Sequence, residues 1–554
     1  MGKYAIGIDF GTLSGRAVLV DVSSGKELAS SVYEYANGVI DDQLPAGGVK
    51  LEHDWALQDP KDYLRVVQKT VPAVVKEAGI DPNDVIGIGT DFTACTMLPC
   101  KKNGTPLCTL AEFKSRPSAW VKLWKHHAAQ PEANKINEVG QARGEEFLKR
   151  YGGKYSSEWF FSKLFQTLDE DPGVYDATDL FVEAADWIVW QLTGRYVRNE
   201  CTLGYKTMWI KDAGGFPSKD FFRSFDTRLE NVVEQKLGGE TLPLGAKVGT
   251  LTPAMAKKLG LPETVAVCVG NVDAHVSVPA CTVTTPGKLV MIMGTSICHM
   301  VVGTDRAIVP GMCGVVQDGI IPGTWGFEAG QSAVGDIYGW FVDNFVPDQV
   351  RRLANMARMS IHEYLAGEAA KLRPGQSGLL ALDWCNGNRS ILVDVDLSGL
   401  IVGLTLATKA HEVYRALIEA TAFGTYKIIR TFEESGVKID ELYACGGLPE
   451  RNDLVMQIFS DVTGRTIKIA RSGQAGALGS AMHAAVAAGP AAGGYATIAD
   501  AAGAMAGLKN KVYTPNADNH AVYDKLFAEY ELLHDYFGRG ANNVMKRLRA
   551  LRQG

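Results

Sequence analysis

The chain has 554 residues, 46% of them hydrophobic and 21% charged, with a formal net charge of −6 and ten cysteines. Its length exceeds what one hydrophobic core usually supports, so we expect at least two lobes. The weakly acidic balance argues against nucleic acid or an anionic membrane as partner. No cysteine pair has zinc-site spacing and no apolar run reaches the ~20 residues of a membrane helix, which favours a cytoplasmic protein with reduced thiols.

The chain begins with an apolar strand, a glycine-containing turn and a second apolar strand over residues 4–21. This pattern predicts a hairpin that gathers Asp9, Gly11, Thr12 and Arg16 at one point. Glycine lets the backbone approach a ligand closely, and turn N–H groups with an arginine fork suit phosphate oxygens. A carboxylate beside an anion site implies a cation between them, most simply Mg²⁺ held by Asp9. An ordinary hairpin turn is the alternative.

Strand-like runs alternate with helical patterns over the following residues, which favours an α/β fold. An apolar run at residues 85–90 ends in Asp91-Phe92-Thr93. A second apolar run, at residues 265–272, leads to Asp273, and α/β sheets place their sites at the carboxyl ends of strands. Helices are predicted at residues 123–129, 145–150, 162–168, 182–192 and 521–551.

The strand-and-turn pattern of the N-terminus is repeated in the second half of the chain. Residues 287–293 are predicted as a strand that leads into Gly294-Thr295-Ser296. We therefore expect two lobes that each carry a phosphate-contacting turn. The boundary is placed just before the second of these strands, so the predicted lobes span residues 1–283 and 284–554.

Neither a Walker A motif nor a protein-kinase glycine-rich loop is present, so phosphate binding requires another arrangement. The series Asp9-x-Gly11-Thr12, Gly294-Thr295-Ser296 and Gly446-Gly447 resembles the superfamily of actin, Hsp70 and sugar kinases. Within it, residues 399–419 resemble the second signature of the FGGY family of carbohydrate kinases, with one departure at Leu417. Five segments resemble the L-ribulokinase branch of that family: residues 90–94, 123–127, 203–206, 270–275 and 326–331.

The resemblance implies two ribonuclease-H-like lobes with an ATP and sugar cleft between them. It implies that Asp9 holds Mg²⁺ and that Arg16 and Thr295 assist phosphoryl transfer. The residues that it places at ATP are Gly11, Thr12, Arg16, Gly294, Thr295, Gly335, Gly446, Gly447 and Asn452. For Gly335, helix–helix packing is the alternative.

On the sugar side, the resemblance implies that Asp273 is the general base that accepts the proton of the attacking hydroxyl. The residues that it places at the sugar are Phe92, Thr93, Ala94, Trp124, Lys206, Asp273 and Glu328. A helix-capping Asp273, a solvated Lys206 and a merely packed Trp124 remain alternatives, and His275 reads more readily as a buried supporting residue than as a catalytic one.

The expected activity is ATP-dependent phosphorylation of the 5-hydroxyl of L-ribulose, as in L-arabinose catabolism, with no nucleic acid or membrane partner. A homodimer is left open. D-ribulose, ribitol and xylulose are alternative acceptors. A sugar-independent ATPase of the actin or Hsp70 type is the alternative of another class. Asp273, Lys206 and Glu328 together argue against it, because hydrolysis needs no base aimed at a sugar hydroxyl.

Overall fold

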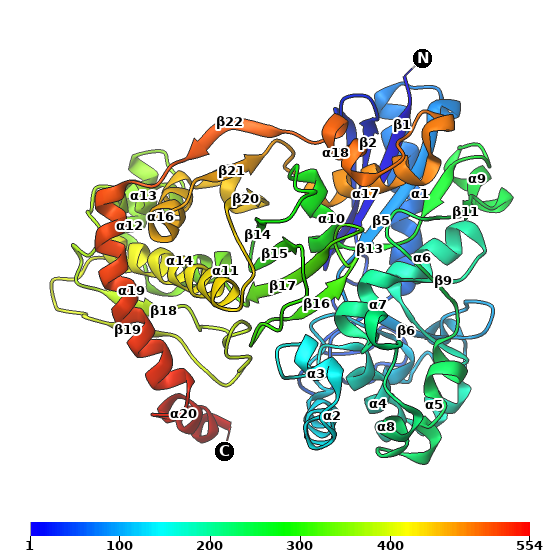
Figure 1. The fold of residues 1–554 in the computed structure, drawn as a ribbon, viewed down its shortest axis with the longest axis horizontal. Coiled ribbons are helices and arrows are strands. Elements are labelled where there is room, and N and C mark those ends of the chain that lie inside the picture. Colours follow the sequence, from blue (N-terminus) through cyan, green and yellow to red (C-terminus); the bar gives the residue numbers. More distant parts are fainter. Residues whose placement is uncertain (1, 554) are drawn as a thin grey trace.

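Two lobes lie side by side in the computed structural model, which describes residues 2–553 (Figure 1). Each lobe is built on a seven-stranded sheet with helices packed against it, so the predicted α/β fold with two lobes is confirmed. Within residues 2–553, no helix combines the length and the apolar character that crossing a membrane requires.

The first sheet contains the N-terminal hairpin. Its strands are β1 (Tyr4–Phe10), β2 (Ser14–Asp21), β3 (Glu27–Glu34), β5 (Val85–Phe92), β11 (Lys247–Thr250), β12 (Ala266–Cys268) and β13 (Asn271–Val272). They follow the order β11-β12-β5-β1-β2-β3, and β13 also pairs with β5. β1 is antiparallel to β2 and parallel to β5, so Asp9 lies opposite Arg16 on one side and Asp91 on the other.

The second sheet repeats the hairpin in the other lobe. Its strands are β14 (Lys288–Met293), β15 (Ile297–Gly303), β16 (Gly314–Gln317), β17 (Trp325–Gln331), β20 (Glu441–Cys445), β21 (Ile467–Ala470) and β22 (Leu508–Tyr513). They follow the order β16-β17-β15-β14-β20-β21-β22. β14 and β15 form the antiparallel hairpin, and β14 is parallel to β20. The turn after β14 and the glycines after β20 therefore lie at the same edge of the sheet.

The remaining strands form three smaller sheets. A four-stranded sheet with the order β4-β7-β6-β8 lies below the first sheet in Figure 1, and two strand pairs stand apart from it. The bounds are β4 (Leu57–Gln58), β7 (Val121–Lys122), β6 (Met97–Cys100) and β8 (Leu180–Glu183), with β9 (Val197–Asn199) paired to β10 (Glu240–Leu242) and β18 (Leu380–Leu382) paired to β19 (Leu400–Val402).

Helix ends follow ordinary capping chemistry. At the start of the first helix, the Asp59 side chain accepts from the Lys61 N–H, and Gly79 ends the helix with φ 64°. The helices of the first half are α1 (Pro60–Ala78), α2 (Gln130–Arg143), α3 (Glu146–Arg150), α4 (Phe160–Glu170), α5 (Pro172–Ala177), α6 (Ala184–Thr193), α7 (Glu200–Lys206), α8 (Lys219–Arg223), α9 (Pro253–Leu259) and α10 (Asp273–Ala280). Those of the second half are α11 (Gly335–Phe345), α12 (Asp348–Met356), α13 (Ile361–Ala369), α14 (Ala410–Glu434), α15 (Gly447–Arg451), α16 (Asp453–Thr463), α17 (Ala475–Ala488), α18 (Ile498–Met505), α19 (Ala517–Gly538) and α20 (Val544–Gln553).

One helix of the second half packs on the first sheet. α17 lies against β1 and β5 (Figure 1). The approach is close: a Cβ on Gly7 would lie 1.7 Å from the Ala477 carbonyl oxygen, and one on Gly89 would lie 2.0 Å from that of Ser480. The chain thus crosses between the lobes more than once, although the predicted boundary at 283/284 does fall in the connection between α10 and β14.

Most predicted elements form, and two differ. The helices predicted at 145–150 and 162–168 are α3 and α4, and the helical tail is α19 and α20. Residues 182–183 belong to β8, and the apolar helix begins only at Ala184. The prediction of a helix at 123–129 was wrong. Its backbone bonds instead to residues 54–56: the Leu123 N–H donates to the Ala56 carbonyl, and two further N–H groups donate to that of Asp54.

Candidate active site

Side chains from neighbouring segments hold the turn between β1 and β2. The Gly11 N–H closes the turn on the Ser14 carbonyl at 2.9 Å. The Tyr35 hydroxyl donates to the Gly11 carbonyl at 3.0 Å, and the Gln58 amide donates to that of Thr12 at 2.7 Å. We call residues 11–14 the first turn. Its carbonyls are occupied by these donors, which fixes the backbone that is predicted to face phosphate.

Trp124 contacts the first turn through its indole nitrogen. This N–H donates to Thr12 Oγ1 at 3.0 Å, and the Trp124 side chain is half-buried. Trp124 was predicted as a flat surface for the sugar. The observed hydrogen bond connects it to a residue that is predicted to contact ATP, and a sugar contact of the ring face stays a prediction.

A pair of carboxylates lies beside the first turn. Asp91, which the sequence analysis did not assign to the site, faces Asp9 across β1 and β5. Burial, and then the charge of Asp9, raises the pKa of Asp91 well above its usual range, and burial likewise raises that of Asp9. Asp91 Oδ2 accepts from the Ser480 hydroxyl of α17 at 2.5 Å. Its Oδ1 is buried without a hydrogen-bond partner among the described residues.

This pair fits a cation that takes only part of its ligands from protein. An unpartnered carboxylate oxygen beside a second carboxylate is suited to a hard cation. Gly476 leaves space over the pair, since a Cβ there would stand 3.6 Å from Asp91 Oδ1 and 3.8 Å from Asp9 Oδ2. Residues 2–553 contain no cluster of three or more side chains able to hold a metal by themselves. Mg²⁺ commonly uses one or two carboxylates and completes its shell with water and substrate phosphates.

The turn between β14 and β15 is held by the start of α11. We call residues 294–296 the second turn. The Val334 N–H donates to the Thr295 carbonyl at 2.7 Å, and the Gly335 N–H donates to that of Gly294 at 3.2 Å. A Cβ on Gly335 would lie 2.6 Å from the Gly294 carbonyl oxygen, so this glycine permits contact with the second turn and not with another helix. Thr295 itself is exposed.

The glycines after β20 lie next to the second turn. Gly446 has φ 99°, and a Cβ on it would stand 2.4 Å from the Met293 carbonyl oxygen at the end of β14. Only glycine fits this position. Asn452 caps α16, and its side chain accepts from the Val455 N–H at 3.2 Å. The predicted ATP residues of the second lobe therefore lie together at one sheet edge, but the Asn452 amide oxygen has a structural partner.

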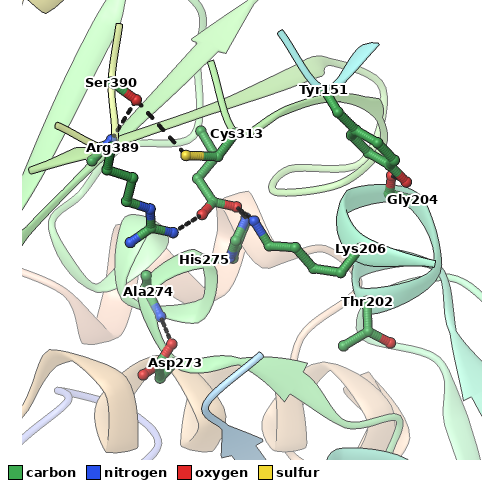
Figure 2. A network of polar contacts seen from close by, with 12 residues as sticks. Tyr151, Thr202, Gly204, Lys206, Asp273, Ala274, His275, Cys313, Arg389 and Ser390 are labelled. Carbon is green, nitrogen blue, oxygen red and sulfur yellow. Dashed lines mark hydrogen bonds and ion pairs between the residues drawn. The ribbon is translucent and has the colours of Figure 1, made fainter. Parts of the chain in front are cut away.

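Asp273 lies where β13 ends and α10 begins. Its Oδ1 accepts from the adjacent Ala274 N–H at 2.7 Å (Figure 2). Because β13 pairs with the end of β5, Asp273 belongs to the same sheet edge as Asp91. Burial, and then the negative charge of Asp9, raises the pKa of Asp273 to about 7. A carboxyl group with this pKa can exchange a proton near neutrality.

Lys206 and Arg389 approach one carboxylate from opposite sides. The Lys206 ammonium donates to Glu328 Oε2 at 2.8 Å, and the Arg389 guanidinium donates to Oε1 at 2.8 Å (Figure 2). Lys206 comes from α7 in the first lobe, and Glu328 comes from β17 in the second, so the ion pair spans the lobes. Both side chains are almost completely buried, so a solvated Lys206 is excluded.

The charges in this cluster are mutually dependent. Burial alone would raise the pKa of Glu328, but the charges of Lys206 and Arg389 outweigh it and hold that pKa far below its usual range. Burial alone would lower the pKa of Lys206, and the charge of Glu328 more than reverses this. Buried ions that are paired in this way remain ionised around neutral pH.

His275 lies beside the cluster as a buried ring without charge. Its Nε2 lies 3.5 Å from Glu328 Oε2, but the geometry makes no hydrogen bond, and neither ring nitrogen has a partner among the described residues. Its ring packs on the ring of Tyr205, and the two ring centroids are 4.3 Å apart. Burial lowers the pKa of His275, so the ring is neutral at neutral pH. This agrees with a buried supporting residue.

The residues at and after the end of β5 include three that are predicted to contact the sugar. The Phe92 ring is in the core, stacked on Phe10 with centroids 4.2 Å apart, which leaves only its backbone for a sugar contact. Thr93 and Ala94 are half-buried. The Thr93 and Thr96 hydroxyls share a hydrogen bond at 2.8 Å. We call residues 93–96 the sugar turn.

Nothing in the sequence around Arg389 indicates that this residue belongs to the site. It follows Asn386-Gly387-Asn388 in a long irregular connection between β18 and β19, a pattern that indicates only a turn. Asp91 did have a signal. Like Asp9, it directly follows an apolar run that is predicted as a strand, and α/β sheets place their sites at such strand ends.

Comparisons with known proteins match the whole of this architecture. The N-terminal domain of the FGGY family of carbohydrate kinases matches residues 4–278, and the C-terminal domain of the same family matches residues 289–488. Proteins named ribulokinase from Anoxybacillus flavithermus and Mycolicibacterium smegmatis are 59% and 51% identical to this chain over 547 and 551 residues. These alignments cover 99% of this chain in both cases, and 97% and 96% of the two relatives.

Solved structures of more distant proteins share the fold. A ligand-bound xylulose kinase from Lactobacillus acidophilus superposes with a TM-score of 0.79 at 19% identity, covering 97% of this chain and 99% of that one. A Plasmodium falciparum glycerol kinase with ADP superposes with a TM-score of 0.75 at 14% identity, covering 96% and 98%. With both domains matched and near-complete relatives above half identity, this chain belongs to the FGGY family of carbohydrate kinases.

Proposed function

We propose that this enzyme transfers the γ-phosphoryl group of ATP to the 5-hydroxyl of L-ribulose. The observation that carries the proposal is the 51–59% identity, over nearly the whole chain, to relatives that are named ribulokinase. Membership of a carbohydrate kinase family accounts for ATP and a sugar as the two substrates. The contacts described above suggest which residues would bind ATP, Mg²⁺ and the sugar, and which would accept the proton.

ATP is proposed to lie between the two turns. Backbone N–H groups and hydroxyls of the first and second turns would contact its phosphates, with Arg16 as the arginine fork. Gly447 has open space where a Cβ would stand, which would leave room for the nucleotide, while Gly335 and Gly446 let the neighbouring backbone pack closely against the second turn and the end of β14. Asp9 and Asp91 would hold Mg²⁺, which when bound neutralises part of the phosphate charge.

Asp273 is proposed as the general base. An aliphatic hydroxyl has a pKa near that of water, ~15.7, whereas that of Asp273 is raised to about 7. Complete proton transfer before phosphoryl transfer would cost roughly 12 kcal/mol, at ~1.36 kcal/mol for each pKa unit of the difference. The carboxylate therefore orients the hydroxyl and takes its proton as the new P–O bond forms.

The sugar is proposed to contact Lys206 and Arg389. Each has further N–H donors beyond the hydrogen bond it gives to Glu328, and carbonyl and hydroxyl oxygens of a ketopentose accept such bonds. Glu328 keeps the Lys206 ammonium ionised and holds both cations in place through its two hydrogen bonds. The sugar turn would contribute backbone groups from Thr93 and Ala94.

A substrate panel tests this proposal. ADP release is measured with L-ribulose, D-ribulose, D-xylulose, ribitol, glycerol, an aldohexose and no sugar. We expect strong stimulation by sugar and the highest kcat/KM for L-ribulose. A much higher kcat/KM for glycerol or an aldohexose would contradict the proposed substrate. Equal turnover with and without sugar would favour an ATPase of the actin or Hsp70 type.

The pH dependence tests the base. We expect kcat/KM for the sugar to fall on the acid side with a midpoint near pH 7, because the pKa of Asp273 is raised to about 7 and only its carboxylate accepts a proton. Above this pH the group is ionised and active; below it the group is protonated and inactive. Initial rates at saturating ATP from about pH 5.5 to about pH 9 provide the measurement. A constant kcat/KM across pH 7 would remove Asp273 from this role.

A further inference from the structure

A fully buried lysine lies between the sugar turn and the first turn. The Lys163 ammonium donates to the Cys95 carbonyl at 2.7 Å and to the Leu123 carbonyl at 2.7 Å. Lys163 is inaccessible to solvent, and both of these acceptors are uncharged. Burial lowers its pKa to about 8. Burying an ammonium in this way costs stability that an apolar side chain would not, which calls for an explanation beyond packing.

The first acceptor belongs to the sugar turn. Cys95 directly follows Ala94 and has φ 60°, a conformation that residues other than glycine rarely adopt. Such a backbone persists only where the surroundings hold it. Lys163 holds its carbonyl, and the next carbonyl, of Thr96, accepts from the Ala184 N–H at 2.7 Å. Two buried donors, the Lys163 ammonium and the Ala184 N–H, therefore hold the backbone of the sugar turn in this conformation.

The second acceptor leads to the first turn. Leu123 precedes Trp124, whose indole N–H donates to Thr12 Oγ1 at 3.0 Å. Residues 123–129 form no helix, so external hydrogen bonds decide where this segment lies. A continuous path thus runs from Cys95 through Lys163, Leu123 and Trp124 to Thr12.

We propose that Lys163 is a positioning residue that sets the distance between the sugar turn and the first turn. The proposal rests on the proposed function, in which these turns hold the sugar and the phosphates. In-line transfer requires reacting atoms within ~3–3.5 Å, and a displacement of about 1 Å can cost about 100-fold in rate. Lys163 contacts neither substrate, yet it determines how the two are aligned.

Lys122 provides a matched control. Its ammonium is also buried, and it donates to the Lys163 carbonyl, Gln166 Oε1 and Thr167 Oγ1 at 2.8–2.9 Å. All three acceptors lie in α4, and none belongs to either turn. A methionine at position 122 therefore removes a buried ammonium of the same kind but removes none of the hydrogen bonds that Lys163 gives to Cys95 and Leu123 or that Trp124 gives to Thr12.

The experiment compares Lys163→Met with Lys122→Met in the full-length enzyme. We expect both variants to lose thermal stability. We expect kcat to fall by about 10- to 100-fold only in Lys163→Met, with a smaller change in KM for either substrate. Equal kcat in the two variants, at comparable losses of stability, would mean that Lys163 is only structural and would overturn the proposal.

A double-mutant cycle with Trp124→Phe adds a test that loss of stability cannot imitate. The phenylalanine keeps a ring but removes the indole donor to Thr12. Because both changes break one path, the double variant should be little slower than Lys163→Met alone. Multiplicative losses in kcat would overturn the proposal. If Lys163→Met does not fold, the same cycle is run with Lys163→Arg, whose wider head displaces both carbonyls, and is judged in the same way.

Failure of the proposed function gives a different result. It appears in the unmodified enzyme, as an absence of sugar-dependent ADP release, and would overturn both proposals together. Unmodified enzyme that phosphorylates another polyol contradicts only the substrate, and the Lys163 comparison is then made with that polyol. If the unmodified enzyme turns over L-ribulose normally but the losses in kcat of the double-mutant cycle are multiplicative, only the Lys163 proposal is overturned.

Discussion

Asp273→Asn is expected to lower kcat by ~10²–10⁴-fold, the usual contribution of a general base. The amide is nearly the same size and can still accept the hydrogen bond from the Ala274 N–H, but it cannot take the proton of the sugar hydroxyl. The KM for ATP should change little. Steady-state rates with saturating ATP and a range of ketopentose concentrations provide the measurement.

The same variant should be more stable than the unmodified enzyme, which serves as its control. Burial raises the pKa of Asp273 to about 7 in the folded state, against ~3.9 for an unperturbed aspartate. The folded protein therefore loses stability as the pH rises from about 4 to about 7, and this loss is complete above pH 7. Thermal unfolding should show Asp273→Asn stabilised above pH 7, with the gain vanishing towards about pH 4. Near-normal kcat in a folded variant would contradict the assignment.

Glu328→Gln is expected to lower kcat/KM for the sugar by at least about 30-fold, the lower end of the ~2–5 kcal/mol lost when one partner of a buried charged pair is removed. The substitution leaves the Lys206 ammonium and the Arg389 guanidinium close together without the carboxylate that holds both. Stability should also fall, since an uncompensated buried charge costs ~3–5 kcal/mol. Kinetics and thermal unfolding of the same preparation test both effects.

The double variant Lys206→Met/Glu328→Gln separates binding from folding. Removing the second charge relieves the uncompensated buried ammonium, so part of the lost stability should return. Activity should not return, because Lys206 is proposed to donate to the sugar. Recovery of kcat/KM together with stability would show that the cluster holds the lobes and does not contact substrate.

Two kinds of sequence information predicted parts of the site. The resemblance to a kinase family assigned Lys206 and Glu328, and local chemistry pointed to the two turns and to Asp273. The first and second turns each need glycine and hydroxyl residues in adjacent positions after an apolar strand. Asp273 ends such a strand directly. These signals extend over fewer than about ten residues and depend on backbone period and turn chemistry alone.

The parts that were missed depend on contacts between distant segments. Arg389 acquires its role only because an irregular connection brings it within 2.8 Å of Glu328. The segment at 123–129 has a helical pattern, but its backbone groups are already bonded to residues 54–56 and to Lys163. Tertiary hydrogen bonds therefore override a local preference that propensity alone would assign.

Phe92 shows how little a motif says about the direction of a side chain. The resemblance placed this residue at the sugar, and its backbone does lie at the sheet edge. Side chains of a strand alternate between faces, however, and the face that Phe92 occupies is the core beside Phe10 and Tyr63. A residue's place in a motif does not determine which face its side chain occupies.

The packing of α17 on the first sheet has a consequence for biosynthesis. Chains usually fold from the N-terminus as they leave the ribosome. Here β1 and β5 are complete after residue 92, but the helix that covers them is made only after residue 475. Ser480 of that helix also supplies the hydrogen bond to Asp91. The first lobe thus stays unfinished until nearly the whole polypeptide has been translated, so an interrupted chain cannot assemble the carboxylate pair beside the first turn in its final form.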